Sequence, residues 1–172
     1  PARWRMVRAG LAGTVHRTVA IGGEVYALTS SGAFRHRAGE PAFLRLAWTS
    51  DEAWDLLSLE DGSLLFADSS TITHRQPDGE VTEIDGATSG RVLLRSASEP
   101  DVVYVGTELG VQVLKQDERG WRSVFRSDAM DNPGVLTLVE IGPRELLIGA
   151  ERGGIRRLAF ARGSAWRMRE EK

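Results

Sequence analysis

A repeated segment of eight residues constrains the fold of this chain more than any other feature of its sequence. Four copies occupy residues 25–32, 64–71, 103–110 and 146–153, at spacings of 39, 39 and 43 residues. Each copy has three apolar residues, then in most copies a small residue, then a polar turn that usually closes on glycine. Internal copies at such spacings indicate a repeat architecture.

Turn-forming residues flank every copy, since glycine, proline and aspartate supply the backbone angles of tight hairpins. They occupy residues 22–23, 61–62, 99–101 and 142–143 before the copies, and 38–40, 77–79, 117–120 and 162–164 after them. An apolar or aromatic residue follows each second turn, at Phe43, Val81, Trp121 and Trp166. Each unit is therefore expected to be four short strands joined by three hairpins. No window of twelve or more residues has a helical period, so the predicted class is all-β.

Four-stranded units of about 40 residues are typical of β-propeller blades. The second strand of each unit is almost continuously apolar, which indicates a strand covered on both faces, as in stacked blades. The small residues Ala67, Gly106 and Gly149 are expected to let the next blade's backbone come close. Two β-sandwich domains are the alternative, but sandwiches do not predict internal copies near this period.

We predict a single propeller segment over residues 1–172, with about four four-stranded blades. The blades are placed at about 14–48, 53–86, 91–127 and 135–170. A further strand at 4–8 resembles the outer strands that begin at Trp121 and Trp166, as if it completed a preceding blade. The simplest interpretation is a segment of a longer propeller. A closed four-bladed ring and two chains closing an eight-bladed ring remain open alternatives.

Residues 103–111 resemble the two-component regulator propeller repeat, which has an aromatic-apolar-Gly-Thr sequence, two variable residues, glycine and an apolar residue. Residues 147–155 are similar, whereas the first two copies depart from the pattern at Leu28 and Thr71. Such repeats typically build the extracytoplasmic sensor regions of bacterial hybrid histidine kinases. The resemblance therefore implies a non-catalytic sensing module, with the kinase outside this chain.

The hairpin at residues 115–121 is also similar to the Asp-box repeats of sialidase-like propellers, although its serine is missing and its glycine is displaced. In that box the aspartate, here Asp117, caps a turn, and even a perfect copy would not imply an enzyme. A glycan-binding or glycan-hydrolysing propeller of the sialidase-like class is the alternative function.

Composition excludes several kinds of chemistry. The chain has no cysteine, which rules out disulfides, thiol nucleophiles and iron–sulfur clusters. Its net charge of −2 gives no general attraction to nucleic acid, and no apolar run is long enough for a membrane helix. His16, His36 and His74 fall at different phases of the repeat, so we expect no metal site and no cofactor.

Ligands usually meet one end of a propeller, built from the loops after the second strands and from the linkers between blades. The candidate ligand-binding residues in these segments are Asp51, Glu52, Trp54, Glu108, Asp128, Asp131, Asn132, Glu151 and Arg152. The expected partner is a small molecule, a glycan or a protein, with homo-oligomers through open blade edges also expected. The predicted function is non-catalytic sensing or interaction by a periplasmic or extracellular signalling protein, with the cytoplasm not excluded.

Overall fold

The computed structural model describes residues 3, 6–49, 52–127, 134–161, 163 and 166–168. These residues form strands and turns and contain no helix, which confirms the predicted all-β class. No helix that could cross a membrane is therefore found in this part of the chain. The chain divides into two compact units, unit 1 at Pro1–Trp54 and unit 2 at Asp55–Lys172.

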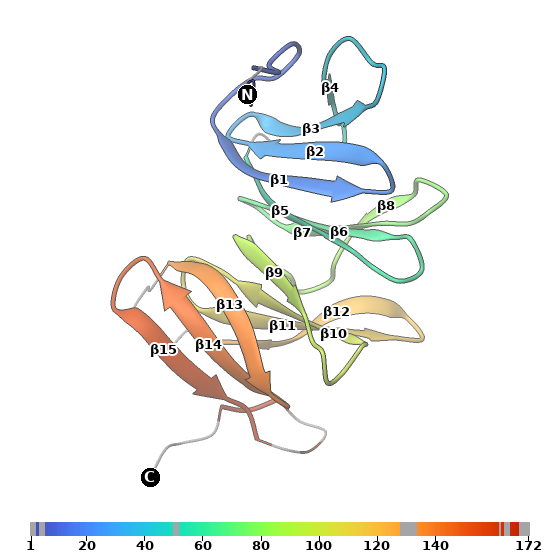
Figure 1. Ribbon diagram of the computed structural model, residues 1–172. Helices are drawn as coiled ribbons and strands as arrows, with labels where there is room; N and C mark the ends of the chain where they lie inside the picture. Colours follow the sequence, from blue (N-terminus) through green and yellow to red (C-terminus); the bar gives the residue numbers. More distant parts are fainter. Residues whose placement is uncertain are drawn as a thin grey trace. The chain divides into compact units, whose positions relative to one another are not determined.

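Unit 1 contains one antiparallel sheet, sheet 1, whose strands are hydrogen-bonded in chain order (Figure 1). Its strands are β1 (Val15–Ile21), β2 (Glu24–Thr29), β3 (Gly32–Arg37) and β4 (Leu44–Arg45). Ala27, Phe34 and Phe43 form a small buried cluster on one face of this sheet, and Leu11 packs against them. The segment before β1 is held there by a hydrogen bond from the Phe43 amide to the Ala9 carbonyl.

Unit 2 contains three more antiparallel sheets, and its first strand begins just before the unit boundary. Sheet 2 has β5 (Ala53–Ser58), β6 (Leu64–Asp68), β7 (Ile72–Arg75) and β8 (Val81–Glu83). Sheet 3 has β9 (Val92–Arg95), β10 (Val102–Gly106), β11 (Val111–Asp117) and β12 (Gly120–Arg126). Sheet 4 has β13 (Val135–Gly142), β14 (Glu145–Ala150) and β15 (Gly154–Ala159).

Two predicted strands differ from the structure over the residues that it describes. Among the described residues sheet 4 has three strands, and near Trp166, where a fourth was expected, they form an isolated bridge between Phe160 and Met168. The predicted strand at 4–8 is described only at residues 6–8, which lie outside any strand. Trp4 and Arg5 are outside the described residues.

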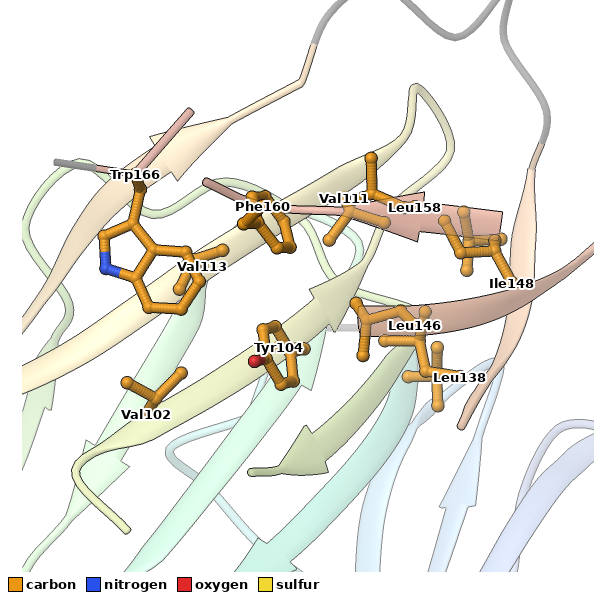
Figure 2. Packing of buried hydrophobic residues seen from close by; sticks show 12 residues of the cluster. Val102, Tyr104, Val111, Val113, Leu138, Leu146, Ile148, Leu158, Phe160 and Trp166 are labelled. Atoms are coloured by element: carbon orange, nitrogen blue, oxygen red, sulfur yellow. The ribbon is translucent and has the colours of Figure 1, made fainter. Parts of the chain in front are cut away.

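The core of unit 2 lies between its sheets, as expected for stacked blades. One cluster joins sheets 2 and 3, with Leu65, Ile72, Val103 and Leu114 among its members. A second cluster joins sheets 3 and 4 around Tyr104, as Figure 2 shows. Every residue of β6 and β10 is buried, so the prediction that these inner strands are covered on both faces is confirmed.

The small residues at the ends of the inner strands allow neighbouring atoms to come close, but the neighbour differs from one strand to the next. The backbone of Gly90, which leads into sheet 3, lies so near Ala67 that an added Cβ would be 3.1 Å from the alanine Cβ. At Gly106 the close neighbour is a side chain of sheet 4, because an added Cβ would lie 2.4 Å from Val135 Cγ1. At Gly149 the close neighbour is Thr137 of the same sheet.

Aspartates close three of the hairpins in unit 2 by the same local device. The Oδ1 atoms of Asp61, Asp78 and Asp117 each accept a hydrogen bond from the backbone amide two residues further on, at 2.9–3.0 Å. Such Asx turns satisfy an amide that would otherwise need water and so favour the tight reversal. Asp117 therefore has the turn-capping role that its position in the sequence suggested.

Candidate functional site

The loops after β10 and β14 lie at the same end of unit 2, because both strands run toward it. Thr107 shapes the first loop, since its Oγ1 donates to the Gly110 carbonyl and accepts from the Leu109 and Gly110 amides. We name this region the Arg91 end. It comprises residues 88–91, 107–110, 134 and 151–153.

The segment leading into sheet 4 is hydrogen-bonded to both loops and brings them together. The Gly134 amide donates to the Glu108 carbonyl at 2.8 Å, and the Glu151 amide donates to the Gly134 carbonyl at 2.8 Å. Gly134 has a φ of +58°, and a Cβ there would lie 2.9 Å from Glu151 Oε2. Only glycine fits this position without strain or displacement of the carboxylate.

Arg91 joins the two loops through its side chain. Its Nη2 lies 3.5 Å from Glu108 Oε2 and its Nη1 lies 3.2 Å from Glu151 Oε2. The arginine side chain is 20% exposed, whereas the two glutamate side chains are 63% and 58% exposed. The guanidinium is therefore held within the site, and the carboxylates keep much of their surface available to hydrogen-bond donors from outside.

A cavity of about 300 Å³ lies beside this group of charges. Its lining residues come from the linker before sheet 3, the loop after β10 and the end of β12: Thr88, Ser89, Thr107, Glu108, Leu109 and Arg126. Glu108 belongs both to the cavity wall and to the contact with Arg91. The cavity thus combines hydroxyl groups, one carboxylate, one guanidinium and one aliphatic side chain, a mixture suited to a small polar ligand.

The structure brings some of the predicted ligand-binding residues together. Glu108 and Glu151 meet at Arg91, and Arg152 is exposed in the same loop as Glu151. Glu52 and Trp54 belong to unit 1, where Trp54 stacks on His16 at 4.3 Å between ring centroids. Asp51, Asp128, Asp131 and Asn132 lie outside the described residues.

Sequence reasoning missed Arg91, Ser89 and Arg126. Arg91 directly precedes β9, at the position that Gly134 holds before β13, so the repeat alignment contains a signal in retrospect. A charged residue in one repeat at a position where another repeat has glycine is a candidate for a specific ion pair. Its two partners could not be identified without the three-dimensional arrangement.

Several titratable groups with clear pKa shifts lie outside the Arg91 end. Burial opposes ionisation of Glu24 in unit 1, but hydrogen bonds from Tyr26, Arg35 and Arg37 outweigh it and lower its pKa to about 2. Burial, reinforced by the charges of Glu140 and Glu99, raises the pKa of Tyr104 to about 12. No group of three or more potential metal ligands gathers among the residues that the structure describes.

Comparison with known proteins identifies the fold and leaves the family open. No family model matches the chain, and no curated protein matches it. The extracellular domain of a hybrid two component system from B. thetaiotaomicron has a TM-score of 0.65 at 13% identity, covering 83% of this chain and 20% of that chain. The structure of YCF48 bound to a D1 peptide has a TM-score of 0.58 at 18% identity, covering 87% of this chain and 52% of that chain.

These two likenesses show that the chain has the β-propeller fold that its repeats predict. The chain spans about a fifth of the first of those chains and about half of the second. Virginiamycin B lyase from Staphylococcus aureus is also similar, with a TM-score of 0.49 at 13% identity over 83% of this chain and 54% of that one. That likeness is too low to support an inference about activity.

Proposed function

We propose that this chain is a non-catalytic, ligand-sensing β-propeller module that binds a small polar ligand at the Arg91 end. One observation carries the proposal. The Arg91 contact with Glu108 and Glu151 stands next to a cavity of about 300 Å³ that shares Glu108 with it. Ligand pockets begin at about this volume, which suits a monosaccharide or a dipeptide.

The groups around the cavity indicate how such a ligand would be held. The hydroxyl groups of Thr88, Ser89 and Thr107 can both donate and accept hydrogen bonds. Glu108 can accept from ligand hydroxyl or amino groups, and the aliphatic surface of Leu109 can contact an apolar face of the ligand. Because Arg91 is held by two carboxylates, it keeps Glu108 in place before a ligand arrives, which lowers the entropy lost on binding.

The exposure of the glutamates supports binding rather than catalysis. A carboxyl that acts as general acid near neutral pH needs an environment that favours its neutral form, usually an apolar pocket. Glu108 and Glu151 are instead more than half exposed and each faces a cation. The sialidase-like alternative would need several buried carboxylates and arginines converging at one end.

An extracytoplasmic signalling protein is the setting that we propose for this module. The resemblance of residues 103–111 to two-component regulator propeller repeats supports it. One of the similar structures is an extracellular domain of a hybrid two component system, which agrees with that resemblance. In this setting the effector domain would lie outside the chain and would respond to occupancy of the cavity.

The proposal is tested by amide NMR titration of the ¹⁵N-labelled chain with separate probes: glucose, N-acetylglucosamine, sialic acid and glycylglycine. We expect at least one probe to shift amide signals of residues 88–91, 107–110 and 151–153 in a saturable manner. Glu108→Ala should weaken that response at least tenfold, whereas Asp78→Asn, in a turn of sheet 2, should leave it unchanged. Absence of any response, or shifts confined to other segments, would contradict the proposal, and release of sugar from a sialoside would favour the enzyme alternative.

A further inference from the structure

The two faces of sheet 4 differ in how they are covered. Leu138 and Ile148 are opposite each other in the register of β13 and β14, and both are buried in the core shared with sheet 3 (Figure 2). Val139 and Ile155 lie on the other face, because alternate residues of a strand point to opposite sides. Val139 is 52% exposed and Ile155 is 77% exposed. Leu136 and Ile141, at the two irregular positions of the β13–β14 pairing, are also exposed. The face of sheet 4 with Val139 and Ile155, which also carries the Glu145–Arg157 ion pair, is thus partly apolar and open among the described residues.

The stacking of sheets 3 and 4 shows what such a face accepts. Val135, the first residue of sheet 4, places its Cγ1 over Gly106, where the glycine has no side chain to exclude it. The Val135 amide also donates to the Thr107 carbonyl at 2.9 Å. Between sheets 2 and 3 the backbone of Gly90 approaches Ala67 without an inserted side chain, and the Gly90 amide donates to the Asp68 carbonyl at 3.1 Å.

Sheet 4 repeats the receiving half of this contact. Gly149 stands near the end of β14, at the position that Gly106 has in β10, and Ala150 follows it where Thr107 follows Gly106. Gly106 has Val92 of its own sheet beside it as well as Val135, and Gly149 has Thr137 of its own sheet beside it. Sheet 4 therefore repeats the position on which Val135 rests in sheet 3. Among the described residues no further strand follows β15 to supply that side chain.

Sheet 1 carries the inserting half. Val15 is the first residue of β1, as Val135 is the first residue of β13, and in both strands a register irregularity follows directly. Val135 is fully buried at 0% exposure, whereas Val15 is 45% exposed. Among the described residues no glycine receives the Val15 side chain, which stands at the edge of the sheet 1 face whose centre Leu11 covers.

We propose that sheet 4 of one copy binds sheet 1 of a second copy, with Val15 inserted over Gly149. A second copy fits because every copy carries both halves, and each half repeats a contact already used inside the chain. The contact joins two different surfaces, so it is heterologous, and such contacts produce either a closed ring or an open chain of copies. Two copies that close the ring would bring eight sheets together, which lies within the usual range for propellers.

Sedimentation velocity over a range of chain concentrations tests this association. We expect the mass to rise from one copy to two or more with concentration. Ile155→Asp and Val15→Asp should each raise the dissociation constant at least tenfold, because each places a charge in the apolar contact. Leu44→Asp, at an exposed leucine on β4, is the control and should leave the association unchanged.

Mixing the two variants separates this arrangement from other kinds of association. The Val15→Asp chain keeps a normal sheet 4 and the Ile155→Asp chain keeps a normal sheet 1. An equal mixture should therefore form one-to-one dimers that grow no further, although each variant alone stays monomeric. A wild-type chain that is monomeric at all concentrations, or a mixture without dimers, would overturn the proposal. Far-UV circular dichroism of each variant, with Ile155→Lys as a second substitution at this site, confirms that loss of association is not loss of folding.

Discussion

The two ends of unit 2 each place an arginine between loops, but the two arginines have very different surroundings. Arg144 is 12% exposed, and its guanidinium lies 4.2 Å from the centre of the Trp166 ring. It is paired with both carboxylate oxygens of Glu99 and donates to the carbonyls of Ala161 and Gly163. We name this region the Arg144 end. It comprises residues 96–101, 142–145, 161, 163 and 166.

Arg91 has ion-pair partners on two loops, but both are carboxylates that remain largely in water. Arginine therefore has two different roles in unit 2. The Arg144 guanidinium stabilises the fold, because unfolding would break its contacts with an aromatic ring, a mostly buried carboxylate and backbone carbonyls. A guanidinium between exposed carboxylates adds little stability and leaves those carboxylates available for recognition.

Replacing Arg144 with alanine should test the stabilising side of this comparison with the largest effect. We expect the free energy of unfolding to fall by about 3 kcal/mol, because Glu99 is mostly buried and would lose its cation. The strained φ of +61° at Arg144 would remain in the alanine variant. Urea unfolding followed by tryptophan fluorescence measures the loss.

Arg91→Ala is the matched control for this measurement, with an expected loss of less than about 1 kcal/mol. Arg144→Lys should recover part of the stability, since lysine keeps the charge but cannot pair with both oxygens of Glu99. Equal losses for Arg91→Ala and Arg144→Ala would show that the two arginines contribute equally to stability and would contradict this difference between the ends.

The Tyr104 hydroxyl makes the stability of the Arg144 end sensitive to alkaline pH, because it is buried in the core near the charges of that end. Its pKa of about 12 exceeds that of an unfolded tyrosine, about 10. A raised folded-state pKa contributes stability that is complete below pH 10 and is lost as pH rises toward 12. We expect this loss to be about 2 kcal/mol, measured by urea unfolding at several pH values.

Tyr104→Phe is the control for the alkaline effect and should remove this part of the pH dependence. The Ser96 hydroxyl is near Tyr104, but the two groups do not reach hydrogen-bonding geometry, and no other partner is found among the described residues. Phenylalanine should therefore be tolerated at neutral pH within about 1 kcal/mol. A variant that loses stability above pH 10 as steeply as the wild type would refute this assignment.

Much of the fold could be predicted from the sequence because burial on both faces leaves a direct trace in it. The apolar runs that end at Ala67 and Gly106 predicted the wholly buried strands β6 and β10. The same pattern in β14 gives a strand that is only partly buried, because one of its faces is left open among the described residues. A local sequence pattern cannot report whether a neighbouring sheet is present.

The charged sites were harder to predict, because their residues are far apart in the chain. The sequence placed Glu99 in one predicted turn and Arg144 directly after another. The pairing of the two side chains, however, depends on how sheets 3 and 4 stack. Arg91 likewise meets Glu108 and Glu151 only through the stacking of the sheets. Glu108 and Glu151 could be placed on loops from the repeat, and their role in binding stays a prediction.

The Glu140 hydrogen bonds provide a test of stability near the Arg144 end with a smaller expected effect. Its carboxylate accepts hydrogen bonds from the hydroxyl groups of Ser96 and Ser98 and from the Ala97 amide, which ties β13 to the hairpin after β9. Glu140→Ala should lower the free energy of unfolding by about 1.5 kcal/mol, because hydrogen bonds to a charged acceptor contribute that much. Glu140→Gln keeps one acceptor oxygen and should recover part of the loss in the same urea measurement, so identical losses for the two variants would contradict the hydrogen-bond explanation.

Glu151→Gln should have the smallest effect and so provides the strictest check on the Arg91 end. The Glu151 side chain is more than half exposed, and its distance to Arg91 is that of a surface ion pair. We expect stability to change by less than about 0.5 kcal/mol, and by still less in 0.5 M salt, where exposed charges are screened. The backbone hydrogen bond from the Glu151 amide to Gly134 would remain, so the loop should keep its place. A loss of more than about 1.5 kcal/mol in the free energy of unfolding would mean that the Arg91 end stabilises the fold as the Arg144 end does. The two carboxylates would then be explained by stability alone, without a ligand.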